Sequence, residues 1–311
     1  MNSIECAKTL LSNENIIILT HRNPDGDAIG SAAALCCALR RAGRNAYLYP
    51  NDEVSDKLLP FYREYPAPDG FEARYTIAVD VASEAQFPNG FTGKVDFCID
   101  HHPSNTRYAA QNFIRPKKAA CGEIIADVIK QMNGDITKEE ADLLYIAVTT
   151  DTGCFQYANT NANTLRTAAM LLEAGADNVR LNTAFFRKAS AGRLKLEGMI
   201  YDGITLHQNG IVAVAIVTEK MLRESGATGK ELDDIASLVG RIEGEKVGIT
   251  IRELSDGGSK VSVRTAEGIN ASDICAVFGG GGHALAAGCT VPAPPLKTKE
   301  LILGVVQEVL K

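Results

Sequence analysis

The stretch NIIILTHRNPDGDAIGSAAALCCALRRAG, residues 15–43, decides the fold of the first half of the chain. The apolar run at 15–20 has the length of a buried strand, and it leads through a polar loop into 28–42, which is rich in helix formers. Gly43 predicts the end of that helix. A buried strand that enters a helix in this way is the first half of a parallel βαβ unit.

The same alternation continues toward the middle of the chain. Further strands are predicted at 45–49, 75–81 and 95–99, and further helices at 119–132, 138–150, 163–174 and 180–187. Thr137 and Glu140 form a capping-box signal at the start of one helix. Alternating strands and helices predict an α/β domain with a parallel sheet and helices on both faces. Ligands bind such a sheet at the carboxyl ends of its strands.

The pattern changes in the last third of the chain. Turn residues at 208–210 and 255–259 each separate two apolar runs, so both stretches predict β-hairpins. Helices are predicted at 190–201, 232–239, 271–277 and 298–310. We therefore expect three parts: a catalytic domain at 1–186, a linker helix at 187–203, and a smaller mixed α/β domain at 204–311 across a cleft.

Composition excludes several classes of protein. The 311 residues carry a net charge of −6, which argues against a protein that coats long duplex DNA. The apolar runs fall far short of the roughly 20 residues that a membrane span needs, and the N-terminus lacks the features of a signal peptide. Eight cysteines without C-x-x-C spacing predict no zinc site and a reducing compartment. We expect a cytoplasmic protein that does not contact membranes.

Potential metal ligands follow several of the predicted elements. His21, Asp25 and Asp27 lie in the loop after the first strand, where the two carboxylates could instead be helix caps. Asp80 lies near the end of the third strand, and Asp151 follows an apolar helix. Each of these two residues alone could simply belong to a turn.

The fourth strand ends in Asp100-His101-His102, a pattern that seldom arises by chance. Carboxylates and imidazoles without thiolates suit Mn²⁺ or Mg²⁺. Carboxylates crowded at one sheet edge would repel one another without dications. Two divalent ions about 3.5–4 Å apart would relieve that repulsion and form a hydrolytic clamp for phosphate esters.

A glycine run marks the second domain. Gly279, Gly280, Gly281 and Gly282 precede His283, and we expect a helix to begin at that histidine. Backbone N–H groups of such a run suit phosphate oxygens, although a flexible loop has the same sequence. Arg264 is a candidate phosphate partner, with a surface arginine as the alternative.

These motifs resemble those of a known family. HRNPDGDAIGS, Asp80, Asp100-His101-His102 and TTDTG, in this order, resemble the four motifs of the DHH phosphoesterases. GGGGHALAAG resembles the signature of the DHH-associated domain of the first type. The resemblance spans residues 15–290, and the length resembles that of the NrnA-type enzymes, which degrade very short oligonucleotides and dephosphorylate 3′-phosphoadenosine 5′-phosphate.

The resemblance implies roles for these residues. One metal ion would be held by His21, Asp25 and Asp80, and the second by Asp27, Asp80, His101 and Asp151, with Asp80 bridging. His102 would contact the phosphate or donate a proton, and Asp100 would orient a histidine; which histidine ligates is left open. Arg264 and His283 would bind a substrate phosphate across the interdomain cleft.

We therefore expect a manganese-dependent phosphoesterase with two Mn²⁺ ions, or Mg²⁺ in their place, that acts on short oligonucleotides or nucleotides. A phosphodiesterase for cyclic or linear dinucleotides is the main alternative. A manganese inorganic pyrophosphatase would share the first-domain motifs, but the glycine–histidine run argues against it. A non-catalytic nucleotide-binding protein is a further alternative. It would be expected to lack at least one of the metal-ligating residues, and the presence of all of them argues against it. The oligomeric state is open, and a homodimer is one alternative.

Overall fold

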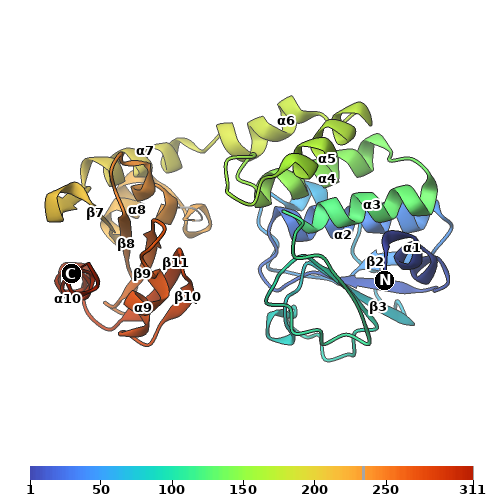
Figure 1. Cartoon of the computed structure of the whole chain (residues 1–311), viewed down its shortest axis with the longest axis horizontal. Helices are drawn as coiled ribbons and strands as arrows, with labels where there is room; N and C mark the ends of the chain where they lie inside the picture. Colours follow the sequence, from blue (N-terminus) through green and yellow to red (C-terminus); the bar gives the residue numbers. More distant parts are fainter. Residues whose placement is uncertain (233–234, 311) are drawn as a thin grey trace. The chain divides into compact units, whose positions relative to one another are not determined.

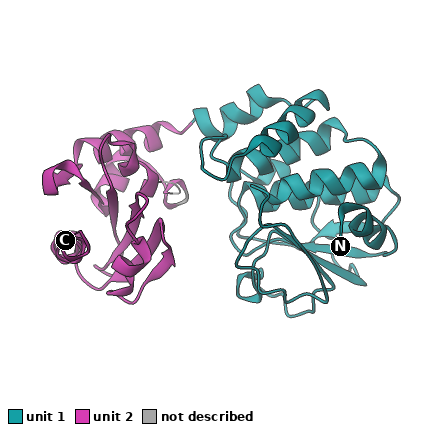
Figure 2. Cartoon of the chain, viewed as in Figure 1, with its two compact units in different colours: residues 1–188 teal, residues 189–311 magenta. Residues whose placement is uncertain are grey.

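The computed structural model describes residues 1–232 and 235–310, and the chain divides into two compact units, 1–188 and 189–311 (Figure 2). The first unit ends two residues after the boundary expected at 186. None of the helices in the described part of the chain is long and apolar enough to cross a membrane.

A five-stranded parallel sheet forms the centre of the first unit, in the order β2-β1-β3-β4-β5 (Figure 1). The strands are β1 (Ile16–Leu19), β2 (Ala46–Leu48), β3 (Tyr75–Val79), β4 (Phe97–Asp100) and β5 (Gln111–Ile114). The first four confirm the predicted strands. The sequence analysis missed β5, because its first two residues are polar and only its last two are buried.

The α-helices cover one face of this sheet. They are α1 (Ser3–Leu11), α2 (Gly26–Arg41), α3 (Cys121–Asn133), α4 (Lys138–Asp151), α5 (Ala162–Glu173) and α6 (Asn178–Asn182). Alternate strand residues such as Ile18, Ile77 and Ile99 share one buried core with α1 to α4. The predicted capping box at Thr137 is confirmed, and α1 was not predicted.

The opposite face of the sheet differs from the expectation of helices on both faces. Ala78 and Cys98 point into a second core with Val81 and Ala109, and aromatic side chains from the loops pack against it. The segment between β3 and β4 contains one short 3₁₀ helix, Glu84–Gln86, and no α-helix. The α/β class is confirmed, with one helical face and one face covered by loops.

Two glycines bring α2 and α4 close together. A Cβ atom on Gly30 would clash with the Leu143 carbonyl oxygen, and one on Gly26 would clash with the Thr150 side chain. Gly26 and Gly30 are four residues apart and therefore lie on the same side of α2. This close packing places the C-terminal end of α4, with Asp151, beside the N-terminal end of α2.

The second unit contains a six-stranded mixed sheet in the order β10-β11-β9-β8-β7-β6. Its strands are β6 (Thr205–His207), β7 (Val212–Val217), β8 (Val247–Glu253), β9 (Ser259–Thr265), β10 (Gly281–His283) and β11 (Ala286–Val291). Both predicted hairpins are confirmed as antiparallel pairs, β6 with β7 and β8 with β9. Asn209 and Gly210 have the positive φ angles that their turn requires.

The helices of the second unit are α7 (Ala191–Asp202), α8 (Glu219–Ser225), α9 (Ala271–Ala276) and α10 (Pro295–Val309). Helix α7 corresponds to the expected linker helix, yet Leu196 and Ile200 are buried in the core of the second unit. For the helix expected at 232–239, residues 233 and 234 lie outside the described residues. Two short 3₁₀ turns, Ile235–Ser237 and Val239–Arg241, follow them.

Candidate metal centre

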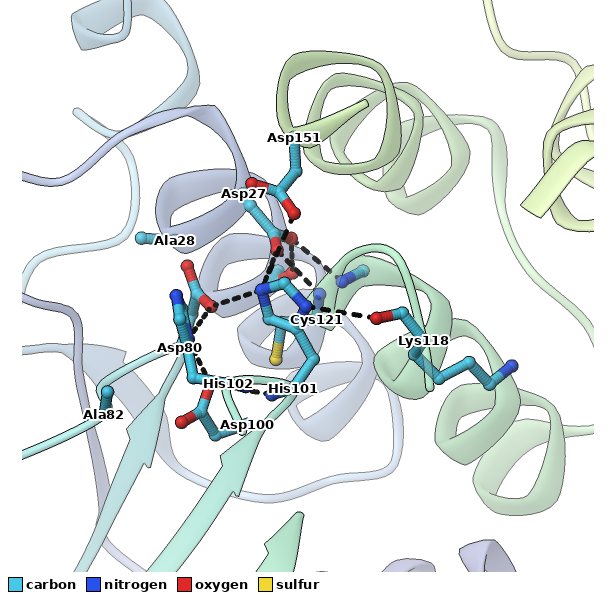
Figure 3. A network of polar contacts seen from close by, with 12 residues as sticks. Asp27, Ala28, Asp80, Ala82, Asp100, His101, His102, Lys118, Cys121 and Asp151 are labelled. Atoms are coloured by element: carbon cyan, nitrogen blue, oxygen red, sulfur yellow. Dashed lines mark hydrogen bonds and ion pairs between the residues drawn. The ribbon is translucent and has the colours of Figure 1, made fainter. Parts of the chain in front are cut away.

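The parallel sheet brings the ligand-bearing motifs to one edge. His21 follows β1, Asp80 follows β3 and Asp100 ends β4, and these strands run in the same direction. Their carboxyl ends therefore meet, as Figure 3 shows for Asp80 and Asp100. Three overlapping groups have ligand atoms within 4.8 Å of one another: His21, Asp25 and Asp80; Asp27, His101 and Asp151; and Asp80, Asp100, His101 and His102.

His101 lies at the centre of the acidic side chains (Figure 3). Its Nε2 atom is 3.7 Å from Asp27 Oδ2, 3.5 Å from Asp80 Oδ1 and 3.6 Å from Asp151 Oδ2. Its Nδ1 atom lies 3.2 Å from the Lys118 carbonyl oxygen, which can only accept a hydrogen bond. Nδ1 therefore carries the proton, and the lone pair of Nε2 faces the carboxylates, which is the tautomer of a metal ligand.

Asp80 ends its strand in an unusual backbone conformation. Its φ angle is +60°, in the left-handed region that aspartate and asparagine tolerate better than most residues. This turn leaves the side chain only 3% exposed, and Oδ1 has no hydrogen-bond partner. A buried carboxylate oxygen without a donor is costly, so this atom suits a cation.

Asp27 is held by backbone and side-chain donors. Its Oδ1 atom accepts hydrogen bonds from Ser31 Oγ (2.9 Å) and from the Gly122 N–H (2.9 Å), and its Oδ2 atom accepts one from the Cys121 N–H (2.6 Å). These two N–H groups belong to the first turn of α3, whose dipole favours a carboxylate. Asp25 caps α2 by accepting from the Ala28 N–H at 3.0 Å.

Asp100 is fully buried, and hydrogen-bond donors surround its carboxylate. Its carboxylate accepts hydrogen bonds from the His101 and His102 N–H groups, from Asn105 Nδ2 at 2.6 Å and from His102 Nδ1 at 2.7 Å. The hydrogen bond to Asp100 raises the pKa of His102. Burial, followed by the charge of His102, lowers the pKa of His101. The two adjacent histidines thus differ: His101 favours the neutral form and His102 the protonated form.

Three of the acidic side chains have raised pKa values. Burial and the charges of Asp151 and Asp25 raise the pKa of Asp27 well above its ordinary value. Burial and the charges of Asp27 and Asp25 do the same for Asp80. Burial and the charge of Asp25 raise the pKa of Asp151 to about 7. Such crowding is relieved either by protons or by cations.

These observations fit a pair of divalent cations. The donor groups contain carboxylates and imidazoles and no thiolate, which suits Mn²⁺ or Mg²⁺. Asp80 belongs to two of the three groups and also lies 3.5 Å from His101, so one carboxylate is within reach of both ligand sets. His21 joins the first set, with Nε2 at 3.8 Å from Asp25 Oδ1.

The second unit places its candidate residues differently from the prediction. Gly281–His283 forms the edge strand β10, so no helix begins at His283, and the glycine run follows α9 instead. The glycine run wrongly predicted a loop that leads into a helix, because glycine is required here for close backbone pairing with β11. A Cβ atom on Gly280 would clash with the Cys289 backbone and side chain, and one on Gly282 with the Ala287 backbone.

The sheet register nevertheless brings two of these candidates to one face. His283 pairs with Ala286, and Ala286 pairs with Arg264, so all three side chains point to the same side. His283 and Arg264 are exposed, and only the small Ala286 lies between them. Gly281 lies on the same side of β10 as His283, while Gly279 and Gly280 precede the strand.

The sequence analysis missed the residues that support the ligands. Asn105 and Ser31 bind Asp100 and Asp27 through side chains, and Lys118 contributes a backbone carbonyl. Asn105 follows the histidine pair within three residues, which is a local signal. The contact of Lys118 with His101 joins a loop to a strand end, and no sequence pattern marks it.

Comparison with known proteins identifies both units. Residues 15–148 match the family described as "DHH family, N-terminal domain", and residues 208–311 match the "DHHA1 domain". The chain is 34% identical over 301 residues to the bifunctional oligoribonuclease and PAP phosphatase NrnA of Thermus thermophilus, covering 95% of this chain and 90% of the relative. It is 26% identical over 298 residues to the protein of the same name from Bacillus subtilis, covering 92% of each.

Solved structures share the fold. An exopolyphosphatase-related protein from Bacteroides fragilis superposes with a TM-score of 0.86 at 22% identity, covering 99% of this chain and 95% of that structure. The exonuclease RecJ bound to manganese gives a TM-score of 0.54 at 13% identity, covering 99% and 93%. With its first-unit and second-unit domains both matched and with a relative at 34% identity across nearly the whole chain, this protein belongs to the DHH family of phosphoesterases.

Proposed function

We propose that this chain is a two-metal phosphoesterase that hydrolyses short oligonucleotides and 3′-phosphoadenosine 5′-phosphate, with Mn²⁺ as its ion and Mg²⁺ as a substitute. The observation that carries the proposal is Asp80, a buried carboxylate with an unpartnered oxygen that belongs to two donor groups. The activities for which the NrnA relatives are named, oligoribonuclease and PAP phosphatase, support these substrates over cyclic dinucleotides or pyrophosphate.

The ligand sets follow from the donor groups. His21, Asp25 and Asp80 would hold one ion, and Asp27, Asp80, His101 and Asp151 the other. When bound, divalent ions in such a pair neutralise phosphate charge and activate water for hydrolysis.

The remaining histidine would handle a proton. The side chain of His102 is 40% exposed, and its Nδ1 atom is occupied by Asp100. A substrate oxygen can therefore reach only Nε2. Because its pKa is raised, His102 holds a proton there closer to neutral pH and would donate it to the leaving oxygen.

We assign catalysis to 1–186 and substrate binding to 204–311. His283 and Arg264 supply two hydrogen-bond donors on an exposed face of the sheet. The residues next to them on this face are Ala286 and Gly281. Such a face lets a phosphate approach the backbone closely. The net charge of −6 suits a short substrate better than a long polymer.

The test is a substrate panel with purified protein and Mn²⁺. We expect mononucleotide release from dinucleotides to pentanucleotides, phosphate release from 3′-phosphoadenosine 5′-phosphate, and much slower cleavage of a 20-mer. Cyclic dinucleotides and pyrophosphate complete the panel. Equal rates on the 5-mer and the 20-mer, or turnover confined to pyrophosphate, would overturn the proposal.

A further inference from the structure

A single turn of the first unit contacts two of the candidate ligands. This turn, residues 118–122, comprises the end of the connection from β5 to α3 and the first two residues of α3. Its first carbonyl, from Lys118, fixes the ring of His101 (Figure 3), and its last two N–H groups hold Asp27. His101 and Asp27 belong to the same donor group, whose third member is Asp151.

The side chain of Asn159 links Asp151 to this turn through hydrogen bonds. Asn159 Nδ2 donates hydrogen bonds to the Ala119 carbonyl oxygen at 3.1 Å and to the Asp151 carbonyl oxygen at 3.0 Å. The amide group has two N–H donors, so it can serve both carbonyls at once. Asn159 therefore connects the end of α4 to the turn that forms hydrogen bonds with the other two ligands.

We infer that Asn159 is a positioning residue that holds Asp151 against the turn at 118–122 and thereby sets the geometry of the Asp27–His101–Asp151 group. The inference rests on the proposed two-metal function. It concerns one ion only, because the two hydrogen bonds that Asn159 Nδ2 donates reach Ala119 and Asp151, and Asp151 belongs to the group with Asp27 and His101.

The backbone after Asp151 explains why such a connection is needed. Gly153, Cys154 and Phe155 have φ angles of +55°, +56° and +69° in succession. Each non-glycine residue in this region costs roughly 1–2 kcal/mol, so the loop holds this form only where its surroundings fix it. Asn159 bridges the far end of this loop back to Asp151, which restrains the carboxylate at the helix end.

The chemistry of the amide yields a sharp test. Aspartate has nearly the same shape as asparagine but only accepts hydrogen bonds, so Asn159→Asp cannot donate to either carbonyl. If Asn159 positions Asp151, the aspartate variant binds metal no better than Asn159→Ala. If residue 159 instead contacts the ion, a carboxylate there would strengthen binding. Asn159 is exposed, so neither variant removes core packing.

The experiment is calorimetric titration of the metal-free full-length protein with Mn²⁺. The parent should bind two ions, and both Asn159 variants should bind one of them about 10–100-fold more weakly, the usual effect of losing a group that orients a ligand. Asn163→Asp is the matched control: it adds the same charge at an exposed asparagine whose side chain contacts Arg166. We expect it to bind both ions as the parent does.

Several results would overturn the inference. Parental affinity of Asn159→Ala would show that the bridge does not position Asp151, and tighter binding by Asn159→Asp would make residue 159 a ligand. Equally weakened binding of both ions would contradict the assignment of Asn159 to the Asp27–His101–Asp151 group alone. A parent that binds two ions yet cleaves no oligonucleotide would refute the proposed function and leave the positioning role standing, whereas a parent that binds no Mn²⁺ would refute both.

Discussion

Asp80→Asn is expected to stabilise the metal-free protein and to abolish its response to Mn²⁺. Asparagine keeps the shape of the side chain and tolerates the φ angle of +60°, whereas Asp80→Ala would place an alanine in the left-handed region at a cost of roughly 1–2 kcal/mol. The asparagine variant removes a buried carboxylate whose Oδ1 atom has no donor and whose pKa is raised by burial and by its acidic neighbours.

The size of the effect follows from that unpartnered oxygen. An unsatisfied buried polar group costs about 1–3 kcal/mol, and more when it is charged. For a unit of 188 residues, each kcal/mol corresponds to about 2–4 °C in melting temperature. Asp80→Asn should therefore melt roughly 2–12 °C higher than the parent in EDTA at pH 8. At a hundredfold excess over the dissociation constant, Mn²⁺ should stabilise the parent by about 2.7 kcal/mol for each ion bound, and the variant far less.

Differential scanning calorimetry with and without Mn²⁺ measures both effects. Asp69→Asn, the same change at an exposed loop carboxylate, is the control and should behave as the parent. The reasoning fails if Asp80→Asn melts below the parent in EDTA and still gains the parental increment from Mn²⁺. Turnover should be lost in Asp80→Asn and kept in Asp69→Asn.

Three further predictions test other parts of the structure. Gly30→Ala should destabilise the protein by about 1–3 kcal/mol, because its Cβ would meet the Leu143 carbonyl oxygen, whereas Gly198→Ala, in open space on α7, should stabilise it by about 0.4–1 kcal/mol; thermal melting of both variants decides. Asp151→Asn should melt at a higher temperature than the metal-free parent, and the difference should grow from about pH 4 to pH 7. The reason is that the pKa of Asp151 is raised to about 7 in the folded protein, so the parent loses stability as the pH rises from the unfolded pKa of 3.8 to that value. A constant difference in melting temperature across that range would contradict this. His283→Ala should raise KM for a dinucleotide and leave Mn²⁺ binding unchanged, and loss of a metal ion in calorimetry would place His283 in the catalytic centre instead.

The sequence predicted the elements whose signals are local. Four apolar runs became β1 to β4, and the capping box at Thr137 began α4 as expected. The prediction failed where tertiary contacts decide the structure. The polar start of β5 pairs with β4, and Gly281 and Gly282 at the end of the glycine run pair with β11 rather than entering a helix.

The clustering of the candidate residues was predictable because most of them lie at the end of an element. His21, Asp80 and Asp100 follow or end parallel strands, and strand direction alone brings them to one edge. The supporting contacts could not be predicted. Asn159 and the Ala119 carbonyl are 40 residues apart, and neither residue type is unusual for a loop.

Because the candidate ligands lie far apart in the sequence, the geometry of the site depends on how the helices that carry them pack together. Asp27 begins α2 and Asp151 ends α4, so their separation depends on how closely these two helices pack. Gly26 and Gly30 permit that packing, and it forces two carboxylates together at the edge of the sheet. The metal-free fold therefore carries a repulsion that its core packing must outweigh, and the divalent ions proposed for this site would relieve it. Stability of the first unit and occupancy of the proposed centre would then be coupled through this helix pair, although neither glycine is a candidate ligand.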